Sequence, residues 1–356
     1  MFATRLKRSA VLALAGLALV VAGCGSDDDE KSSSGSGTGS STAAPEKKAL
    51  KVGLVTDIGG LNDRSFNTLA NKGLQDAQKQ LGITGRVLTS KANSDYVPNL
   101  SSLAQQKYDL VIGVGFLMAD AINTVATKFP KTNFAVIDVD QASLKNKPKN
   151  VAGLIFKEQE AGYLAGYLTG LYAKDEGFDT ISSVGGQKIP PVDHYIAGYQ
   201  AGAKKANSSI KTLNGYSQDF VDQAKCKELA LNQIGQGSKV VFQVAGQCGL
   251  GAIDAAKEKD AEAIGVDADQ AYLGPQVLTS ALKKVDVAVL EAIKSVQDGA
   301  FKGGANTVFE VKNDGVGLGK VSASAQKYVA DVEKVQQQIA DGTITDIPDT
   351  VGGGQS

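Results

Sequence analysis

The chain has 356 residues with 37 basic and 38 acidic side chains, a single histidine and three cysteines. Residues 1–23 hold three basic and no acidic side chains, so the remainder carries 34 against 38, a net charge of about −4. This balance argues against a basic nucleic-acid-binding surface, and the roughly 300 residues from position 50 suffice for two lobes with separate cores.

The N-terminus has the pattern of an export signal. Three basic side chains precede an apolar segment at 10–22 that is short for a membrane-spanning helix. The segment ends in Val21-Ala22-Gly23-Cys24, which resembles the lipobox of bacterial lipoproteins, whose cysteine is lipidated after cleavage. We therefore expect a signal peptide at 1–23 and a lipid on Cys24. The alternative is an ordinary secretory signal with an incidental cysteine.

Residues 24–49 are expected to form a disordered linker, because they are rich in Ser, Gly and Asp and contain almost no apolar side chains. A flexible coil of this length spans on the order of 25–30 Å. We expect it to hold the folded part off the membrane, on the extracytoplasmic face.

A buried strand followed by a helix is predicted directly after the linker. The apolar run at 51–56 is typical of a parallel strand, and the helical pattern extends over 66–81. Asp57 follows the strand, while Phe66 and Asn67 begin the helix. In open α/β sheets such a crevice is where ligands bind. The alternative is a plain strand-turn-helix whose acidic residues serve only the turn and the helix cap.

Strands and helices alternate from there on, which predicts βαβ units and parallel sheets. Further first-lobe strands are predicted at 86–89, 110–114, 134–137 and 151–155, with helices at 100–107 and 118–129. The second lobe is predicted to have strands at 180–184, 211–216, 239–242 and 263–266 and helices at 160–173, 195–206, 221–236 and 250–259.

The last third of the chain is predicted to pass between the lobes again. A strand at 277–282 and a helix at 285–298 are expected to return to the first lobe, 306–311 to cross back, and 326–341 to form a closing helix. The first lobe would thus contain 50–156 and 278–302, the second 157–277 and 303–345. A flexible Gly-rich tail would cover 346–356.

Two cysteines remain once a lipid occupies Cys24. Cys226 and Cys248 are each predicted near the beginning of a helix, and outside the cytoplasm such a pair is a candidate disulfide. Two buried free thiols are the alternative.

Several motifs together resemble the basic membrane protein family, whose members are substrate-binding lipoproteins of ABC transporters. They are Asp57-x-Gly-Gly-x-Asn-Asp-x-Ser-Phe-Asn67, Glu160-x-Gly-Tyr-Leu-Ala-Gly-Tyr167, Gly265-Val-Asp-x-Asp-Gln270 and Thr279-Ser-x-x-Lys283. The resemblance covers residues 50 to about 312. It implies the α/β type I periplasmic-binding-protein fold: two lobes, each a parallel sheet flanked by helices, joined by three hinge crossings.

The resemblance also implies a nucleoside ligand, a purine nucleoside in the best understood members. Two rings, one from each lobe, would stack on the base, while carboxylates and a lysine would hold the ribose. The expected ligand-binding residues are Asp57, Phe66, Asn67, Gly115, Phe220, Gly246, Asp267 and Lys283. Taken by itself, Phe220 could equally be a core residue at a helix start, and Lys283 a solvated residue at a strand end.

One segment departs from the family pattern. Where members often have Ala-Gly-Gly-Thr-Gly, this chain has Ala245-Gly246-Gln247-Cys248-Gly249. The turn is expected to persist, but the additional amide of Gln247 could change which ligand is preferred.

The expected function is a monomeric, non-catalytic receptor that passes a nucleoside to an ABC permease and needs neither cofactor nor metal. His194 follows a Pro-Pro turn and has no second histidine with which to form a metal pair. Three alternatives remain: the same transport role with a sugar-like or signalling ligand, a surface adhesion or antigen lipoprotein, and an enzyme of nucleoside breakdown.

Overall fold

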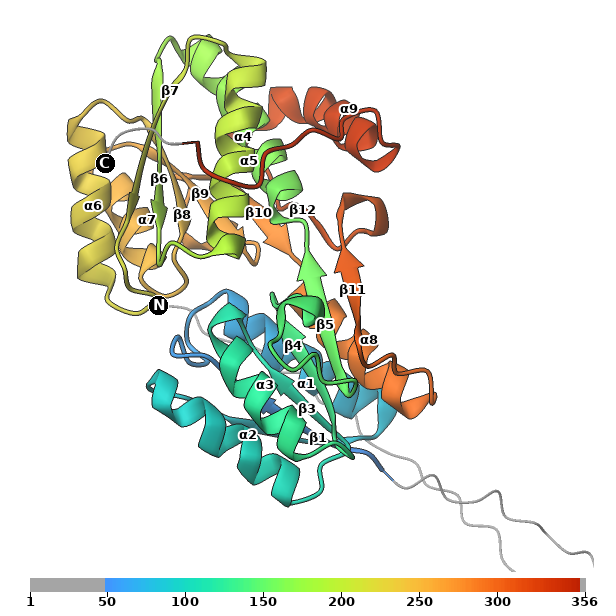
Figure 1. The fold of residues 1–356 in the computed structure, drawn as a ribbon. Helices are drawn as coiled ribbons and strands as arrows, with labels where there is room; N and C mark the ends of the chain where they lie inside the picture. Colours follow the sequence, from blue (N-terminus) through green and yellow to red (C-terminus); the bar gives the residue numbers. More distant parts are fainter. Residues whose placement is uncertain (1–48, 353–356) are drawn as a thin grey trace, which may run out of the picture. The chain divides into compact units, whose positions relative to one another are not determined.

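The computed structural model describes residues 49–352, which contain two six-stranded sheets, each covered by helices (Figure 1). The predicted export signal, Cys24 and the predicted linker up to residue 48 lie outside these residues. We call the two sheets with their helices the first and the second lobe.

The sheet of the first lobe is entirely parallel. Its strands, in spatial order, are β11 (Ala305–Phe309), β5 (Val151–Phe156), β4 (Asn133–Ile137), β3 (Leu110–Gly113), β1 (Lys51–Val55) and β2 (Thr84–Leu88). Because β1 and β3 both lie between other strands and are covered on both faces, their side chains are almost all apolar and buried.

Four helices cover this sheet, two on each face. They are α1 (Phe66–Leu81), α2 (Tyr96–Gln105), α3 (Ala119–Lys128) and α8 (Val285–Gln297). Leu54 of β1 packs in the cluster that contains α1 and α8, whereas its neighbour Val55 packs with α2 and α3. Successive residues of a strand point to opposite faces, so the two helix pairs cover opposite sides of the sheet.

The sheet of the second lobe is parallel except at one edge. Its strands, in spatial order, are β12 (Val316–Leu318), β10 (Val277–Lys283), β9 (Glu262–Asp267), β8 (Val240–Val244), β6 (Thr180–Gly185) and β7 (Lys211–Tyr216). The short antiparallel strand β12 at the edge is not foreseen in the sequence.

Five helices belong to the second lobe: α4 (Glu158–Glu176), α5 (Pro190–Ala206), α6 (Gln223–Gly235), α7 (Gly249–Glu258) and α9 (Val329–Ala340). Helices α4 and α5 pack so closely that a Cβ at Gly166 would lie 2.0 Å from the carbonyl oxygen of Tyr199. The glycines spaced four apart in α4 therefore serve helix–helix packing within the second lobe.

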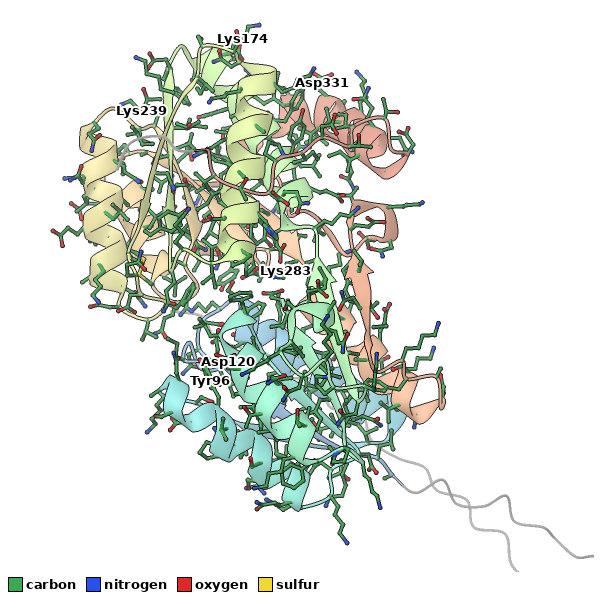
Figure 2. The ribbon with its side chains drawn as sticks, viewed as in Figure 1. Tyr96, Asp120, Lys174, Lys239, Lys283 and Asp331 are labelled. Atoms are coloured by element: carbon green, nitrogen blue, oxygen red, sulfur yellow. A yellow bond between two sulfur atoms is a disulfide. The ribbon has the colours of Figure 1, made fainter. Side chains whose placement is uncertain are left out.

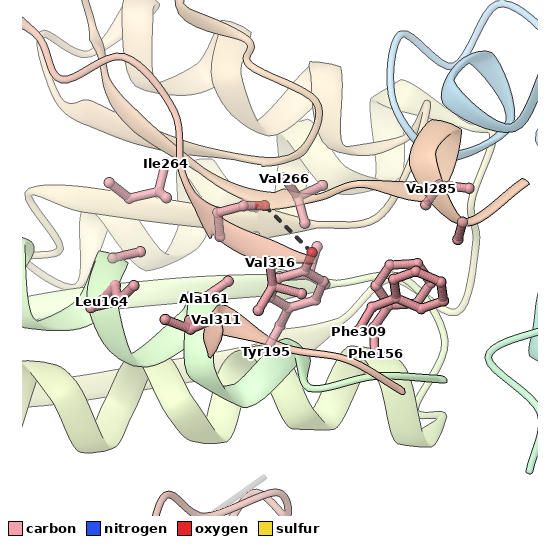
Figure 3. Close-up of a cluster of buried hydrophobic side chains, with 14 of the residues drawn as sticks. Phe156, Ala161, Leu164, Tyr195, Ile264, Val266, Val285, Phe309, Val311 and Val316 are labelled. Atoms are coloured by element: carbon pink, nitrogen blue, oxygen red, sulfur yellow. Dashed lines mark hydrogen bonds between the residues drawn. The ribbon is translucent and has the colours of Figure 1, made fainter. Parts of the chain in front are cut away.

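The chain passes between the lobes three times, after β5, after β10 and after β11. At the first and third passages Phe156 and Phe309 stack with ring centroids 4.9 Å apart (Figure 3). This confirms the two-lobed α/β fold with three crossings that the sequence predicts.

Two strand assignments from the sequence are wrong. The strand at 277–282 was expected in the first lobe, but β10 pairs with β9 in the second lobe, and the chain leaves only at Lys284. Conversely, β11 pairs with β5 in the first lobe, although residues from 303 on were expected in the second. Strand pairing depends on distant partners, so the local pattern of either strand fits both sheets equally well.

The segment after α9 stays in contact with the second lobe as far as it is described. Ile347 and Val351 pack against the cluster that contains Tyr195 and Tyr199 of α5. Figure 1 shows this segment, in dark red, passing across that helix.

Candidate functional site

A cavity with an empty volume of about 630 Å³, including its open mouth, lies between the lobes. The eight residues predicted to bind ligand all line it: Asp57, Phe66, Asn67, Gly115, Phe220, Gly246, Asp267 and Lys283.

The first lobe contributes a carboxylate whose position is fixed by its neighbours. Asp57 Oδ1 accepts hydrogen bonds from Asn67 Nδ2 at 2.7 Å and from the backbone N–H of Gly59 at 3.0 Å. Burial raises the pKa of Asp57 to about 6, although these two hydrogen bonds oppose the rise. Asp57 is therefore a hydrogen-bond acceptor above pH 6 and can donate below it.

Asp63 serves the helix that carries these residues. Its carboxylate accepts from the backbone N–H groups of Ser65, Asn67 and Thr68 at 2.6–3.1 Å. These donors would otherwise be unpaired at the start of α1. Capping by Asp63 leaves the Ser65 hydroxyl free for a contact with the other lobe.

Gly115 provides the space in which Phe66 and Asp57 lie. Its φ of +108° is rarely adopted by residues with a side chain, and a Cβ there would lie 3.2 Å from Asp57 Oδ2 and 3.3 Å from Phe66 Cε1. A larger residue would therefore crowd both side chains.

The second lobe contributes a ring supported from behind. Phe220 packs so closely on Gly186 that a Cβ there would lie 2.3 Å from Phe220 Cε1. The backbone N–H of Cys248 donates to the carbonyl oxygen of Phe220 at 3.0 Å. Cys248 forms a disulfide with Cys226, which ties this turn to α6, and Gly246 and Gln247 of the turn line the cavity.

Asp267 joins the lobes across the cavity. Ser65 Oγ of the first lobe donates to Asp267 Oδ2 at 2.7 Å. The hydroxyl of Tyr195 donates to Asp267 Oδ1 at 3.2 Å. It also lies 3.4 Å from the carbonyl oxygen of Ala281, and this second bond is the dashed line at Tyr195 in Figure 3. Burial raises the pKa of Asp267, while nearby Lys283 and the Ser65 hydroxyl lower it.

Lys283, at the end of β10, is the cation of the site (Figure 2). Its ammonium lies 2.7 Å from Asp138 Oδ1 and 2.8 Å from Glu158 Oε1, and its side chain is only 2% exposed. It also lies 5.1 Å from the ring centroid of Phe66 and 4.9 Å from that of Phe156.

The balance of charge keeps this lysine protonated. Burial alone would lower the pKa of Lys283, but the surrounding carboxylates raise it well above its usual value. Burial raises the pKa of Asp138, against the opposing effect of Lys283. The cavity is lined by the carboxylates of Asp57, Asp63, Asp138 and Asp267 and by one ammonium group, so its charge is predominantly negative.

The comparisons with known proteins identify the fold and the family. A family model described as an ABC transporter substrate-binding protein, PnrA-like, and named Bmp matches residues 50–349. The chain belongs to the Bmp family.

Named relatives and solved structures agree with this membership. The chain is 36% identical to the ABC transporter nucleoside-binding protein BmpA of Lactococcus lactis, over 85% of this chain and 91% of the relative. It is 38% identical to an uncharacterized lipoprotein of Pyrococcus abyssi, over 76% and 69%. An ABC transporter solute-binding protein from Aeropyrum pernix has a TM-score of 0.75 at 28% identity, covering 84% of this chain and 94% of that structure. The chain has the type I periplasmic-binding-protein fold.

Three polar residues of this Bmp-family site were missed in the sequence. Asp138 and Tyr195 line the cavity, and Glu158 holds Lys283 from behind. Asp138 could have been found, because it directly follows strand β4, as Asp57 follows the apolar run at 51–56. Tyr195 and Glu158 lie within helices, where the local pattern gives no sign of a cavity.

Asp138 and Asp267 share a further property. Both have a left-handed backbone conformation, with φ of +67° and +60°. Non-glycine residues adopt this region at a cost of order 1–3 kcal/mol, and such residues cluster at ligand sites. Both lie at carboxyl ends of parallel strands, where α/β proteins bind ligands.

Among the helices in residues 49–352, none combines the length and the hydrophobicity of a membrane span.

Proposed function

We propose that this chain is the nucleoside receptor of an ABC transporter and that its cargo is a purine nucleoside. The observation that carries the proposal is one cavity lined by a ring from each lobe, Phe66 and Phe220, together with carboxylates and Lys283. A base between the rings would gain stacking typically worth about 1–3 kcal/mol per contact, and a purine offers both rings more overlap than a pyrimidine.

The charge of the cavity supports a neutral cargo with hydroxyl groups. Ionised carboxylates accept hydrogen bonds but cannot donate them, so ionised Asp267 suits the hydroxyl donors of a ribose, as does Asp138 above its pKa, which burial raises to about 7. A phosphate would meet several carboxylates and one lysine already paired with Asp138 and Glu158. We therefore expect nucleosides to bind and nucleotides to be rejected.

In this proposal, the chain makes only non-covalent contacts with the cargo. Because each lobe contributes a ring and at least one carboxylate, a bound nucleoside would stabilise the arrangement in which the lobes meet. A permease that recognises this arrangement would receive loaded receptors preferentially. The receptor would work as a monomer.

Membrane attachment through a lipid on Cys24 belongs to the same proposal. It is supported by the segment Val21-Ala22-Gly23-Cys24, by the polar stretch that follows and by the lipoprotein name of the Pyrococcus relative. Cys24→Ala should move the chain from the membrane fraction to the soluble fraction of its host, and an unchanged distribution would contradict the anchor.

A thermal-shift screen of the full chain, followed by calorimetry, tests the cargo. The probes are guanosine, inosine, adenosine, uridine, guanine, ribose and guanosine monophosphate. We expect the purine nucleosides to raise the melting temperature and the monophosphate to have little effect. Stabilisation by ribose alone would indicate a sugar receptor, and release of free base during incubation would indicate an enzyme.

A further inference from the structure

A chain of charged side chains connects the ligand cavity to the protein surface. Asp138 Oδ1 lies 2.7 Å from Lys283 Nζ, and Lys283 Nζ lies 2.8 Å from Glu158 Oε1. Glu158 Oε2, the other oxygen of that carboxylate, lies 3.0 Å from His194 Nδ1. Lys283 and Asp138 line the cavity, whereas Glu158 and His194 lie behind it.

The members of this chain differ in their access to water. The side chains of Lys283 and Glu158 are each 2% exposed, while that of His194 is 28% exposed. His194 is also the only histidine of the chain, and neutral pH lies close to the ordinary titration range of histidine. A proton can therefore reach His194 from solvent while its effect is exerted on buried groups.

We infer that Glu158 and His194 are positioning residues for Lys283, and that the protonation state of His194 sets how strongly the site holds its ligand. The inference rests on the proposed function, because it assigns Lys283 a contact with the cargo. Lys283 has three N–H donors, one of which bonds Glu158 Oε1, while its ammonium also forms an ion pair with Asp138. A remaining N–H is available to an oxygen of the ligand.

The direction of the effect follows from the charge on Glu158. When His194 is protonated, it shares the negative charge of Glu158, so Lys283 is less strongly held and donates more readily to the ligand. When His194 is neutral, Lys283 alone compensates this buried carboxylate. Affinity should therefore fall as pH rises through the pKa of His194, and by linkage the ligand should raise that pKa.

The groups that face His194 come from three other elements. Burial lowers the pKa of His194, and so does Lys283 of β10. Glu158 of α4 and Asp349 of the C-terminal segment raise it, and the sum of these effects is a raised pKa. On its own helix, Asp193 is engaged by Lys188 at 2.8 Å and by the Tyr216 hydroxyl at 2.5 Å. The net effect is a pKa of His194 above its ordinary value.

The single histidine makes a direct measurement possible. In the full chain with a histidine-free tag and ¹³C-labelled imidazole, the one ring signal reports the pKa of His194 with and without saturating nucleoside. The probe is guanosine, inosine or adenosine, whichever binds most tightly. We expect a higher pKa in the loaded protein, and an identical pKa in both states would overturn the inference.

The second measurement is the dissociation constant between pH 5.5 and 8.5 for the wild type and for His194→Gln. Glutamine can still donate to Glu158 but cannot carry charge. We expect the wild type to lose about fivefold more affinity across this range than the variant, at the lower end of typical coupling. Burial also raises the pKa of Asp57 to about 6 and that of Asp138 to about 7, both within this range, but both carboxylates are present in the two proteins that are compared.

Asp349→Asn provides a control that leaves Glu158 and the cavity unchanged. It should lower the pKa of His194 and shift the affinity profile to lower pH by the same amount. Superimposable profiles of wild type and His194→Gln, with nucleoside bound by both, would overturn this inference alone. Failure of the wild type to bind any nucleoside would overturn the proposed function and this inference with it.

Discussion

Single residues at the cavity combine burial with charge. Lys283 is 2% exposed, yet it contacts Asp138 and Glu158, which are also almost fully buried. Opposite charges in such an environment depend on one another, because removal of one leaves the others uncompensated. The neighbouring Lys284 pairs with Asp314, whose side chain is 80% exposed.

These two adjacent lysines allow a matched test. Lys283→Met should destabilise the protein by about 3–5 kcal/mol, since it leaves the buried carboxylate of Asp138 without a partner and that of Glu158 with His194 alone. Lys284→Met should change stability by less than about 0.5 kcal/mol, because surface pairs contribute little. Denaturant unfolding at pH 7 measures the free energy of unfolding of both variants. Equal losses would show that the contacts of Lys283 with Asp138 and Glu158 do not behave as buried ion pairs.

The rings should affect binding more than stability. Phe66 is only partly buried, with its ring beside Gly115 at the cavity. Phe66→Ala should weaken nucleoside binding by about 5- to 150-fold, the equivalent of one lost stacking contact. Calorimetry gives the dissociation constant and thermal unfolding of the free protein gives the stability. An unchanged dissociation constant would remove Phe66 from the site.

At the scale of elements, the closest packing in the second lobe is between α4 and α5. Glycines of each helix lie against backbone atoms of the other: Gly162 and Gly166 meet carbonyls of α5, and Gly198 and Gly202 meet carbonyls of α4. Helix α4 begins with Glu158 and α5 carries His194 and Tyr195. This interface therefore fixes the positions of residues behind and beside the cavity.

Gly166→Ala should test this packing against the gain in helix propensity. The added methyl would lie 2.0 Å from the carbonyl oxygen of Tyr199, so the helices must separate, at a typical cost of about 1–3 kcal/mol. In Gly235→Ala, at the end of α6, the methyl would meet nothing within 4 Å. That variant should be neutral or slightly stabilising. The reverse order in thermal unfolding would contradict the close packing.

At the scale of the whole described region, few direct bonds join the lobes besides the three chain crossings. The Ser65 hydroxyl donates to Asp267 across the cavity, and Gln270 Nε2 donates to the carbonyl oxygen of Arg64 at 3.3 Å. A net hydrogen bond to a charged group contributes about 1.5–3 kcal/mol, enough to shift an equilibrium between separated and joined lobes.

Ser65→Ala should therefore favour separated lobes in the free protein. We expect a larger radius of gyration in small-angle X-ray scattering without nucleoside, and a return towards the wild-type value with nucleoside. Thr68→Ala is the matched control, because its hydroxyl donates to Asp63 within the first lobe. If both variants scatter alike, the Ser65 contact does not hold the lobes together.

The sequence by itself determined the alternation of strands and helices, since apolar runs and helical periodicity can both be recognised from neighbouring residues. It also located the eight predicted cavity residues through motifs at strand ends and helix starts. The helix at 66–81 was predicted with the bounds that the structure gives, because Asp63 caps its start and Gly82, with φ of +66°, ends it.

Only the tertiary structure decided that β10 belongs to the sheet of the second lobe and β11 to that of the first. The pairing of each strand depends on contacts that its local sequence does not specify. It likewise decided that Lys283 is buried between Asp138 and Glu158, and that His194 stands behind them. These four residues come from separate elements, and their charges interact strongly because the fold brings them within hydrogen-bond distance and buries them. Local sequence encodes elements and their ends, whereas electrostatic coupling depends on distance in space.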